Sequence, residues 1–140
     1  MEFTRRKLLV IGTGTFAAAS LTGLPALASK TEEMITAFTG GAETGSGALE
    51  LTAPEIAENG NTVPIEVIAP GAVSISVYAD GNPVPAVATF NFGPLNPSHS
   101  ASTRIRLAKS QNVIAVAKMA DGSFQRAEVP VKVTIGGCGG

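Results

Sequence analysis

The sequence has few of the residues with which proteins perform catalysis or bind metals. Its 140 residues include one cysteine, one histidine and no tryptophan. A single cysteine cannot form a disulfide within the chain, and one cysteine with one histidine cannot build a metal site of the Cys/His kind. No glycine-rich phosphate loop, paired-carboxylate motif or Ser-His-Asp spacing stands out. We therefore expect no metal or other cofactor bound by this chain, and no enzymatic turnover by the chain alone.

The chain also has little net charge. Lysine and arginine number 10 against 11 aspartate and glutamate residues, which gives a formal net charge of -1. Nucleic-acid-binding domains are usually basic, so we do not expect nucleic acid as a partner. The length predicts one domain, and a hydrophobic content of 44% is ordinary for a globular core.

Residues 1–28 are typical of an export signal. Arg5 and Arg6 open a positively charged region, a weakly apolar stretch follows, and Ala26 and Ala28 form a small-x-small cleavage pattern. The paired arginines and the mild hydrophobicity favour the twin-arginine route, with an ordinary secretory signal as the alternative. We expect the mature protein in the periplasm, free of the membrane after the signal is removed.

Residues 29–47 predict a short helix and a linker. Ser29 with Glu32 fits a capping box at the start of a helix that runs to Phe38. A pair of glycines ends this helix, and the glycine-rich residues 40–47 predict a flexible linker.

Residues 48–135 predict a β-sandwich domain. Apolar and polar side chains alternate in short runs, and turn signals separate the runs. Proline at 83, 85 and 130 indicates edge strands or bulges, and the uniformly apolar run at 113–117 is typical of a central strand. About seven short strands with little helix predict an all-β, immunoglobulin-like β-sandwich, and a partly open barrel is the alternative. The predicted strands cover residues 49–52, 62–69, 73–78, 84–92, 102–107, 113–117 and 124–135.

Residues 136–140 read Gly-Gly-Cys-Gly-Gly and directly follow the last predicted strand. Glycine has no Cβ, so these glycines leave the cysteine on a flexible arm of little bulk. Cys138 comes three residues after Ile135, a reach of roughly 10 Å when extended. An arm of this kind could place a thiol in a narrow channel on another protein. The arm consists of Gly136, Gly137, Cys138, Gly139 and Gly140.

The surroundings of Cys138 in the sequence favour an attachment point over a catalytic nucleophile. Activated thiols usually have a basic side chain or a helix N-terminus beside them, and the local sequence offers none. We therefore expect partner proteins to supply the chemistry at Cys138. The alternative interpretation is that this cysteine forms an interchain disulfide.

Three other polar side chains are weaker candidates. His99 lies in a loop rich in proline and serine, where we expect a solvated side chain. Arg104 and Arg106 fall on the same face of a predicted strand, where they could receive a sulfonate-like anion or simply form the solvated face of that strand.

The terminal Gly-Gly-Cys-Gly-Gly resembles the signature of the SoxY family, the sulfur-carrier subunits of the bacterial Sox sulfur-oxidation system. Residues 53–67 also resemble that family, and residues 103–108 do so more weakly. With the twin-arginine signal in front, the resemblance spans essentially the whole chain.

The resemblance implies a set of partners and a covalent role for Cys138. It implies an immunoglobulin-like fold that pairs with SoxZ, a subunit exported alongside, as a heterodimer or as a heterotetramer through Cys138. It further implies that Cys138 holds sulfur adducts of thiosulfate. The haem enzyme SoxAX would couple thiosulfate oxidatively to Cys138, and the dimanganese hydrolase SoxB would release sulfate. SoxCD, where present, would oxidise the remaining sulfane sulfur.

Other classes of protein would fit parts of the sequence. A secreted immunoglobulin-like binding module would use its lone cysteine for an interchain disulfide. A ubiquitin-like carrier would hold sulfur on a terminal Gly-Gly carboxylate, but such carriers need ATP-dependent activation, which the export signal makes implausible. An enzyme with a catalytic cysteine would need a base that the sequence does not identify.

Overall fold

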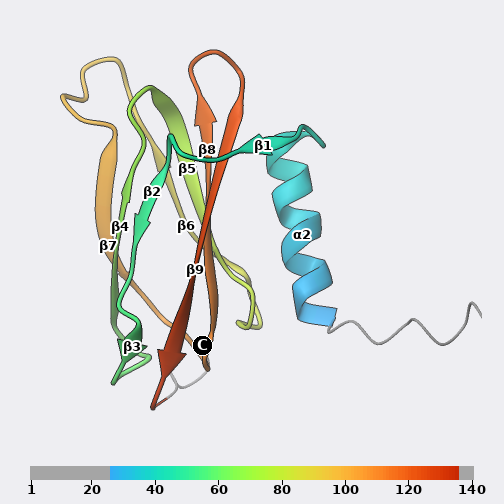
Figure 1. Ribbon diagram of the computed structural model, residues 1–140, viewed down its shortest axis with the longest axis vertical. Coiled ribbons are helices and arrows are strands. Elements are labelled where there is room, and N and C mark those ends of the chain that lie inside the picture. Colours follow the sequence, from blue (N-terminus) through green and yellow to red (C-terminus); the bar gives the residue numbers. More distant parts are fainter. Residues whose placement is uncertain (1–25, 136–140) are drawn as a thin grey trace, which may run out of the picture.

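The computed structural model describes residues 26–135, which form two β-sheets and one helix (Figure 1). Within these residues no helix is long and apolar enough to cross a lipid bilayer. The elements are α2 (Ala26–Thr39), β1 (Thr44–Gly45), β2 (Glu50–Thr52), β3 (Ile56–Ala57), β4 (Val63–Ile68), β5 (Ala72–Ala79), β6 (Ala86–Asn91), β7 (Ser100–Ile105), β8 (Gln111–Met119) and β9 (Phe124–Val133).

The two sheets pack face to face as a β-sandwich. The larger sheet has the strand order β1-β9-β8-β5-β6, with β3 also paired to β9, and the smaller sheet has the order β2-β4-β7. The pairs β4–β7, β5–β8 and β8–β9 are antiparallel, whereas β1 and β3 lie parallel to β9. The predicted immunoglobulin-like sandwich is therefore confirmed, and the barrel alternative is wrong.

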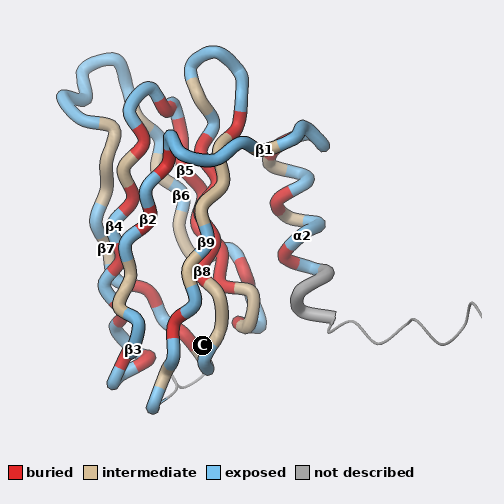
Figure 2. Tube along the Cα trace, in the orientation of Figure 1, coloured by how far each residue is buried: buried red, intermediate tan, exposed pale blue. Residues whose placement is uncertain are grey.

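The hydrophobic core lies between the sheets, where Figure 2 shows most of the buried residues. Burial alternates along β4, because Val63, Ile65 and Val67 are buried while the residues between them are exposed. Ile75 and Val77 of β5 face them from the larger sheet. Burial of one such side chain contributes about 1.5–3 kcal/mol, so the period-two pattern of the sequence accounts for the packing of the sheets.

Strand β8 is buried on both faces, which explains its uninterrupted apolar run. Val113, Ala115 and Ala117 belong to the core between the sheets, whereas Ile114 and Val116 belong to a second cluster on the outer face of the larger sheet. The prediction of a central strand is confirmed, since β8 lies between β5 and β9.

Helix α2 covers this second cluster (Figure 1). Ile35 is buried, and Met34 and Phe38 pack beside it against the sheet. The ring of Phe38 meets that of Phe124 edge-on, with 5.9 Å between centroids and 71° between planes. The apolar face of the helix therefore packs on this domain.

A salt bridge joins the helix to β9. Arg126 Nη2 lies 2.8 Å from Glu32 Oε1, and Nη1 donates to the other carboxylate oxygen at 3.2 Å. Arg126 Nη2 also lies 3.4 Å from Glu128. The hydrogen bond from Arg126 lowers the pKa of Glu32 and raises the pKa of Arg126 itself. This bidentate contact fixes the register of α2 on the sheet.

The C-terminal end of helix α2 agrees with the prediction, and its N-terminal end does not. Gly40 and Gly41 end the helix with φ angles of 68° and 83°, and the Gly41 amide donates to the Thr36 carbonyl at 3.1 Å. This is the Schellman arrangement that favours glycine. The helix begins at Ala26, however, so Ser29 lies within the first turns and is not the N-cap.

Three details of the strands were not predicted correctly. The expected linker contains β1, whose two residues pair with the start of β9. The turn after β2 contains β3, which pairs with the end of β9. Strand β7 ends at Ile105, so Arg106 lies beyond it.

The edge position predicted from Pro130 is confirmed. Pro130 pairs opposite Asn112 of β8 without a bulge, and neither β1 nor β3 pairs with β9 on its other side at this residue.

Replacing Arg126 by methionine should loosen α2 from the sheet. The substitution keeps the aliphatic part of the side chain and removes the salt bridge, so we expect a loss of up to about 1 kcal/mol in the free energy of unfolding at neutral pH. Because the pKa of Glu32 is lowered below its ordinary value of 4.5, the stabilisation is complete above pH 4.5 and is lost as the pH falls through the lowered pKa. Urea unfolding at neutral and acid pH measures both effects.

The control is Arg104→Met, which removes an exposed arginine from the smaller sheet. A difference between Arg126→Met and the native chain that persists at acid pH would contradict the assignment to Glu32.

Candidate functional site

The predicted attachment site lies outside the described residues. Cys138 and its four glycines, like Arg5 and Arg6, belong to stretches that the structure does not describe, so their predicted roles stay predictions. Ala26 and Ala28 of the predicted cleavage site lie at the start of α2. The structure does show the last strand before Cys138, and the contacts that hold that strand.

Hydrogen bonds from the turn around β3 fix the end of β9. The Thr134 amide donates to the Ala57 carbonyl at 3.1 Å, and the Thr134 hydroxyl donates to the Glu58 carbonyl at 3.0 Å. The Gly60 amide donates to the Ile135 carbonyl at 2.7 Å. We call residues 132–135, held in this way, the arm root.

The loop between β7 and β8 holds the arm root from the other side. The Val133 amide donates to Ser110 Oγ at 2.8 Å, and the same hydroxyl lies 3.3 Å from the Val133 carbonyl. The Leu107 amide donates to the Gly60 carbonyl at 2.8 Å, so this loop is also joined to the turn around β3. The turn around β3 and the loop between β7 and β8, which hold the arm root from its two sides, are therefore joined by hydrogen bonds at one end of the sandwich.

A buried asparagine fixes the loop between β7 and β8 in turn. Asn82 is 3% exposed, and its Nδ2 donates to the Arg106 carbonyl at 2.8 Å. Its Oδ1 accepts from the Ala108 amide and from Gln111 Nε2, both at 2.9 Å. A buried amide with these partners is satisfied, so Asn82 joins the β5–β6 connection to the end of the sandwich at which the arm root lies.

This arrangement sets the distance that a thiol at Cys138 can reach. The backbone is held by hydrogen bonds as far as the Ile135 carbonyl. Three residues then span at most roughly 10 Å. This reach is measured from the arm root, which lies at one end of the sandwich.

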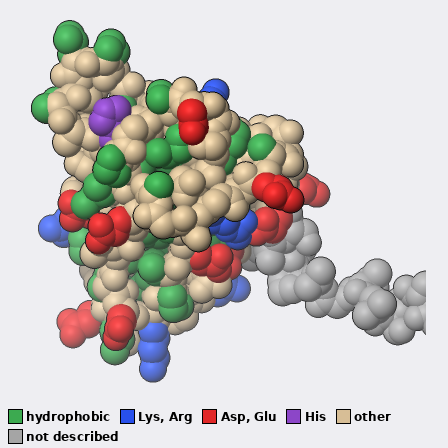
Figure 3. Space-filling model, turned by 45° about the horizontal axis from the view of Figure 1, so that its top comes forward, with side chains coloured by type: hydrophobic (Ala, Val, Ile, Leu, Met, Phe, Trp, Pro, Cys, Tyr) green, Lys and Arg blue, Asp and Glu red, His purple; other side chains and the backbone are tan. Residues whose placement is uncertain are grey.

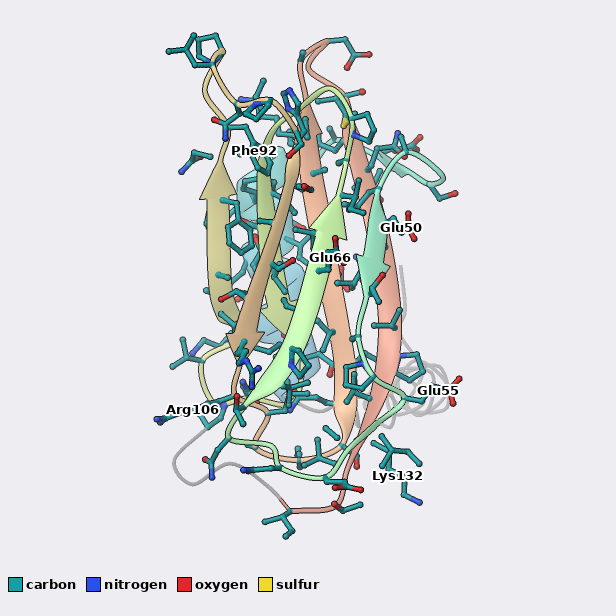
Figure 4. The ribbon with its side chains drawn as sticks, turned by 90° about the vertical axis from the view of Figure 1, so that its left-hand side faces the viewer. Glu50, Glu55, Glu66, Phe92, Arg106 and Lys132 are labelled. Carbon is teal, nitrogen blue, oxygen red and sulfur yellow. The ribbon has the colours of Figure 1, made fainter. Side chains whose placement is uncertain are left out.

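A hollow on the smaller sheet brings one of the predicted arginines into a concave surface. It encloses about 590 Å³ on the side of the molecule that Figure 4 faces, and its charged lining residues are Glu66 and Arg104. Arg104 Nη1 donates to the Thr62 hydroxyl at 3.3 Å. Arg106 is exposed beyond the end of β7 and does not line the hollow. Arg104 and Arg106 are both exposed with Ile105 buried between them, as the alternation predicts, but only Arg104 belongs to β7 and lines the hollow.

His99 is not the solvated side chain that the sequence predicts. Its ring is half-buried, and Nδ1 lies 2.5 Å from the Ala72 carbonyl. The ring also packs against Phe92, with 5.5 Å between centroids. In Figure 3 the purple histidine lies at the end of the molecule that is turned forward. It fixes the loop before β7 to the start of β5, at the end of the sandwich opposite the arm root.

No local pattern in the sequence indicates the groups that hold the arm root. Glu58 and Thr134 are 76 residues apart in the chain and meet through β3, which has two residues. Asn82 has the sequence character of a turn residue. Its hydrogen-bond partners in the β7–β8 loop and at the start of β8 lie 24 to 29 residues further along the chain. Periodicity and turn signals do not encode such distant contacts.

A comparison with protein families identifies the chain. The family model described as sulfur oxidation protein SoxY matches residues 35–138, which include Cys138. The chain belongs to the SoxY family. The SoxY resemblance drawn from the terminal motif and residues 53–67 is thereby confirmed.

A solved structure agrees with this assignment. The sulfur carrier protein SoxY from Chlorobium limicola f thiosulfatophilum is 40% identical, with a TM-score of 0.66, and the match covers 77% of this chain and 99% of that one. No curated protein matches the chain significantly.

More distant structures share the fold of this SoxY chain. A superoxide reductase (neelaredoxin) from Ignicoccus hospitalis is 18% identical over 62% of this chain and 80% of its own, with a TM-score of 0.55. A putative superoxide reductase from Thermotoga maritima is 20% identical over 69% and 89%, with a TM-score of 0.52. At these identities the likeness concerns the sandwich alone.

Replacing Thr134 by valine should loosen the arm root. The change keeps the β-branched shape and removes the hydroxyl that donates to the Glu58 carbonyl. We expect a loss of about 1 kcal/mol in the free energy of unfolding. Hydrogen exchange of the Thr134 and Gly60 amides should quicken, because both close the contact between β9 and the turn around β3.

Thr52→Val on the smaller sheet is the matched control, and it should leave both amides unchanged. Native exchange rates in Thr134→Val would show that the hydroxyl does not hold the arm root.

Proposed function

We propose that this SoxY chain is a periplasmic carrier that holds thiosulfate-derived sulfur covalently on Cys138 and presents it to Sox enzymes. The observation that supports this most directly is the position of Cys138. It is the one thiol of the chain, it lies within the residues that match the SoxY family, and it comes three residues after the last residue of the arm root.

The carrier reaction is written as a loading step and a release step. In loading, the Cys138 thiolate and thiosulfate form an S–S bond and give Cys138–S–S–SO₃⁻. Two electrons leave to the haem enzyme SoxAX, which acts as the oxidant. In release, water cleaves the bond between the outer sulfur and the sulfonate. Sulfate and two protons depart, and a persulfide anion remains on Cys138.

These steps need an arm and a scaffold more than a catalytic site on this chain. A disulfide-like bond forms wherever a thiolate and its partner sulfur are brought together with the correct redox poise. In the proposal, SoxB supplies the water that releases sulfate, and SoxCD, where present, oxidises the remaining sulfane sulfur. The haem and manganese belong to those enzymes, and this chain holds only the covalent sulfur adduct.

The proposal includes a second subunit. SoxY sequences imply pairing with SoxZ, so we propose a heterodimer that the enzymes meet as one unit, and a heterotetramer where two Cys138 residues join. The arm root lies at one end of the sandwich and α2 covers part of the larger sheet, so the outer face of the smaller sheet and the other end of the sandwich are left for the partner subunit in this proposal.

Exposure of the mature protein to thiosulfate and the periplasmic fraction should add one thiosulfate moiety to its intact mass. The adduct should be absent in Cys138→Ser and should be removed by a dithiol reductant, because it is held through a disulfide-type bond. Intact-mass spectrometry reads both results.

An adduct on the Cys138→Ser variant would contradict the carrier assignment. A disulfide-linked dimer of this chain as the main product, with no sulfur adduct, would favour the binding module with an interchain disulfide.

The periplasmic location in this proposal depends on the paired arginines. Arg5→Lys with Arg6→Lys keeps the positive charge and removes the pair that the twin-arginine route reads. The double variant should accumulate in the cytoplasm at the mass of the uncleaved chain. Cell fractionation with mass spectrometry tests this, with a general secretory substrate as the control. Normal amounts of mature protein in the periplasm would rule out the twin-arginine route.

A further inference from the structure

Two large apolar side chains are exposed at the arm root and on the neighbouring strand β3, where polar side chains would be expected. Ile56 is 58% exposed and Ile135 is 67% exposed. Few large apolar side chains of the described residues are exposed to such an extent, and these two both belong to the contact between β3 and β9. The others are Val73, Val84 and Leu95.

The two isoleucines lie at the end of the β3–β9 pair. Ile56 pairs with Lys132 in parallel register, so its side chain points to the same face as that of Lys132. Ile135 lies two residues beyond the end of β9 and is exposed. Figure 4 shows Lys132 at the lower end of the molecule, where β9 ends. We call Ile56 and Ile135 the apolar collar, because Ile135 is the last residue of the arm root and Ile56 lies on β3, which pairs with the arm root at Lys132 and Val133.

The short reach from the arm root brings any enzyme close to the collar. Cys138 comes three residues after Ile135, a stretch that spans at most roughly 10 Å. An enzyme that encloses the Cys138 sulfur in a buried site must therefore bring the mouth of that site within this distance of Ile135. The collar would then be covered by the enzyme surface around the mouth.

Charge does not offer an equally specific signal at this end of the sandwich. The exposed charged residues next to the arm root are Glu55 and Glu58 on the turn around β3, Lys132 on β9, and Arg106 and Lys109 on the loop before β8. Two acidic and three basic side chains give no single sign for a partner to complement. Apolar contact is the recognition that the described residues provide.

We propose that the apolar collar of Ile56 and Ile135 is the docking surface for the enzymes that receive the arm, and that the mouth of their channel presents apolar side chains to it. This inference rests on the proposed carrier function. Two isoleucines bury a small area, which fits a transient contact of the low-area class. A carrier that visits several enzymes needs such a contact, because each enzyme must release it after one step.

The test uses the mature chain with its partner subunit, loaded with thiosulfate on Cys138, as substrate for the sulfate-releasing hydrolase. Ile56→Ser and Ile135→Ser should each raise the KM for the carrier about tenfold, since each removes an apolar side chain buried on docking. The kcat should stay near the native value, because the arm and the adduct are unchanged. Sulfate release at varied carrier concentration gives both constants.

Two controls separate docking from other effects. Leu95→Ser removes a side chain that is 95% exposed at the opposite end of the sandwich, and it should leave the KM unchanged. A small thiol reagent should alkylate unloaded Cys138 at the native rate in all variants, since it needs no docking. Melting temperatures should match, because the substituted side chains are exposed.

Three results would contradict a role of the collar in docking. The KM could stay within twofold of the native value in both isoleucine variants, or Leu95→Ser could raise the KM as much as they do. The isoleucine variants could also lose the partner subunit while keeping their affinity for the enzyme. These differ from failure of the carrier function itself, in which the native chain would take up no sulfur and release no sulfate.

Discussion

The pairing of β9 with its neighbours is the constraint on which the rest of the structure depends. Strand β9 is matched to β8 from Phe124 to Val131, and its last residues are matched to β3. Its first two residues pair with β1, and Arg126, which follows them, forms the salt bridge to α2. A strand fixed in this way cannot shift its register without exposing core side chains. The point at which the chain leaves the sandwich is therefore set by the core.

Much of this fold could be predicted from the sequence, because it depends on local periodicity. The alternation along β4 and β5 and the apolar run of β8 each correspond to a pattern that a few neighbouring residues define. The glycine pair at 40–41 likewise ends the helix through a local backbone geometry. Such elements need no knowledge of distant parts of the chain.

The elements that were missed depend on contacts between distant segments. Strands β1 and β3 have two residues each, too few to show a period, and exist because β9 offers them a partner. His99 looked solvated because its loop is polar, whereas its partners Ala72 and Phe92 come from other elements. Cys138 could be singled out, because its glycine neighbours are contiguous with it, but the groups that hold the arm root could not.

The body of the sandwich is shared with proteins of other function. Superoxide reductases from two organisms have the same fold at 18% and 20% identity, so the arrangement of the sheets does not determine the function of the protein. The Gly-Gly-Cys-Gly-Gly sequence follows the end of β9, and the match to the SoxY family extends to Cys138. The hydrogen bonds of the sandwich hold the end of β9 in a defined place.

The position of the loop at residues 93–99 has a practical consequence for work with this protein. The loop lies at the opposite end from the arm root (Figure 1), and Leu95 at its tip is 95% exposed. Its backbone closes on itself, since the Gly93 amide donates to Asn96 Oδ1 at 2.8 Å and the Asn96 amide to the Gly93 carbonyl at 3.1 Å. Immobilisation on a sensor chip, or attachment of a fluorophore, through this loop would leave the end of β9 directed into solution.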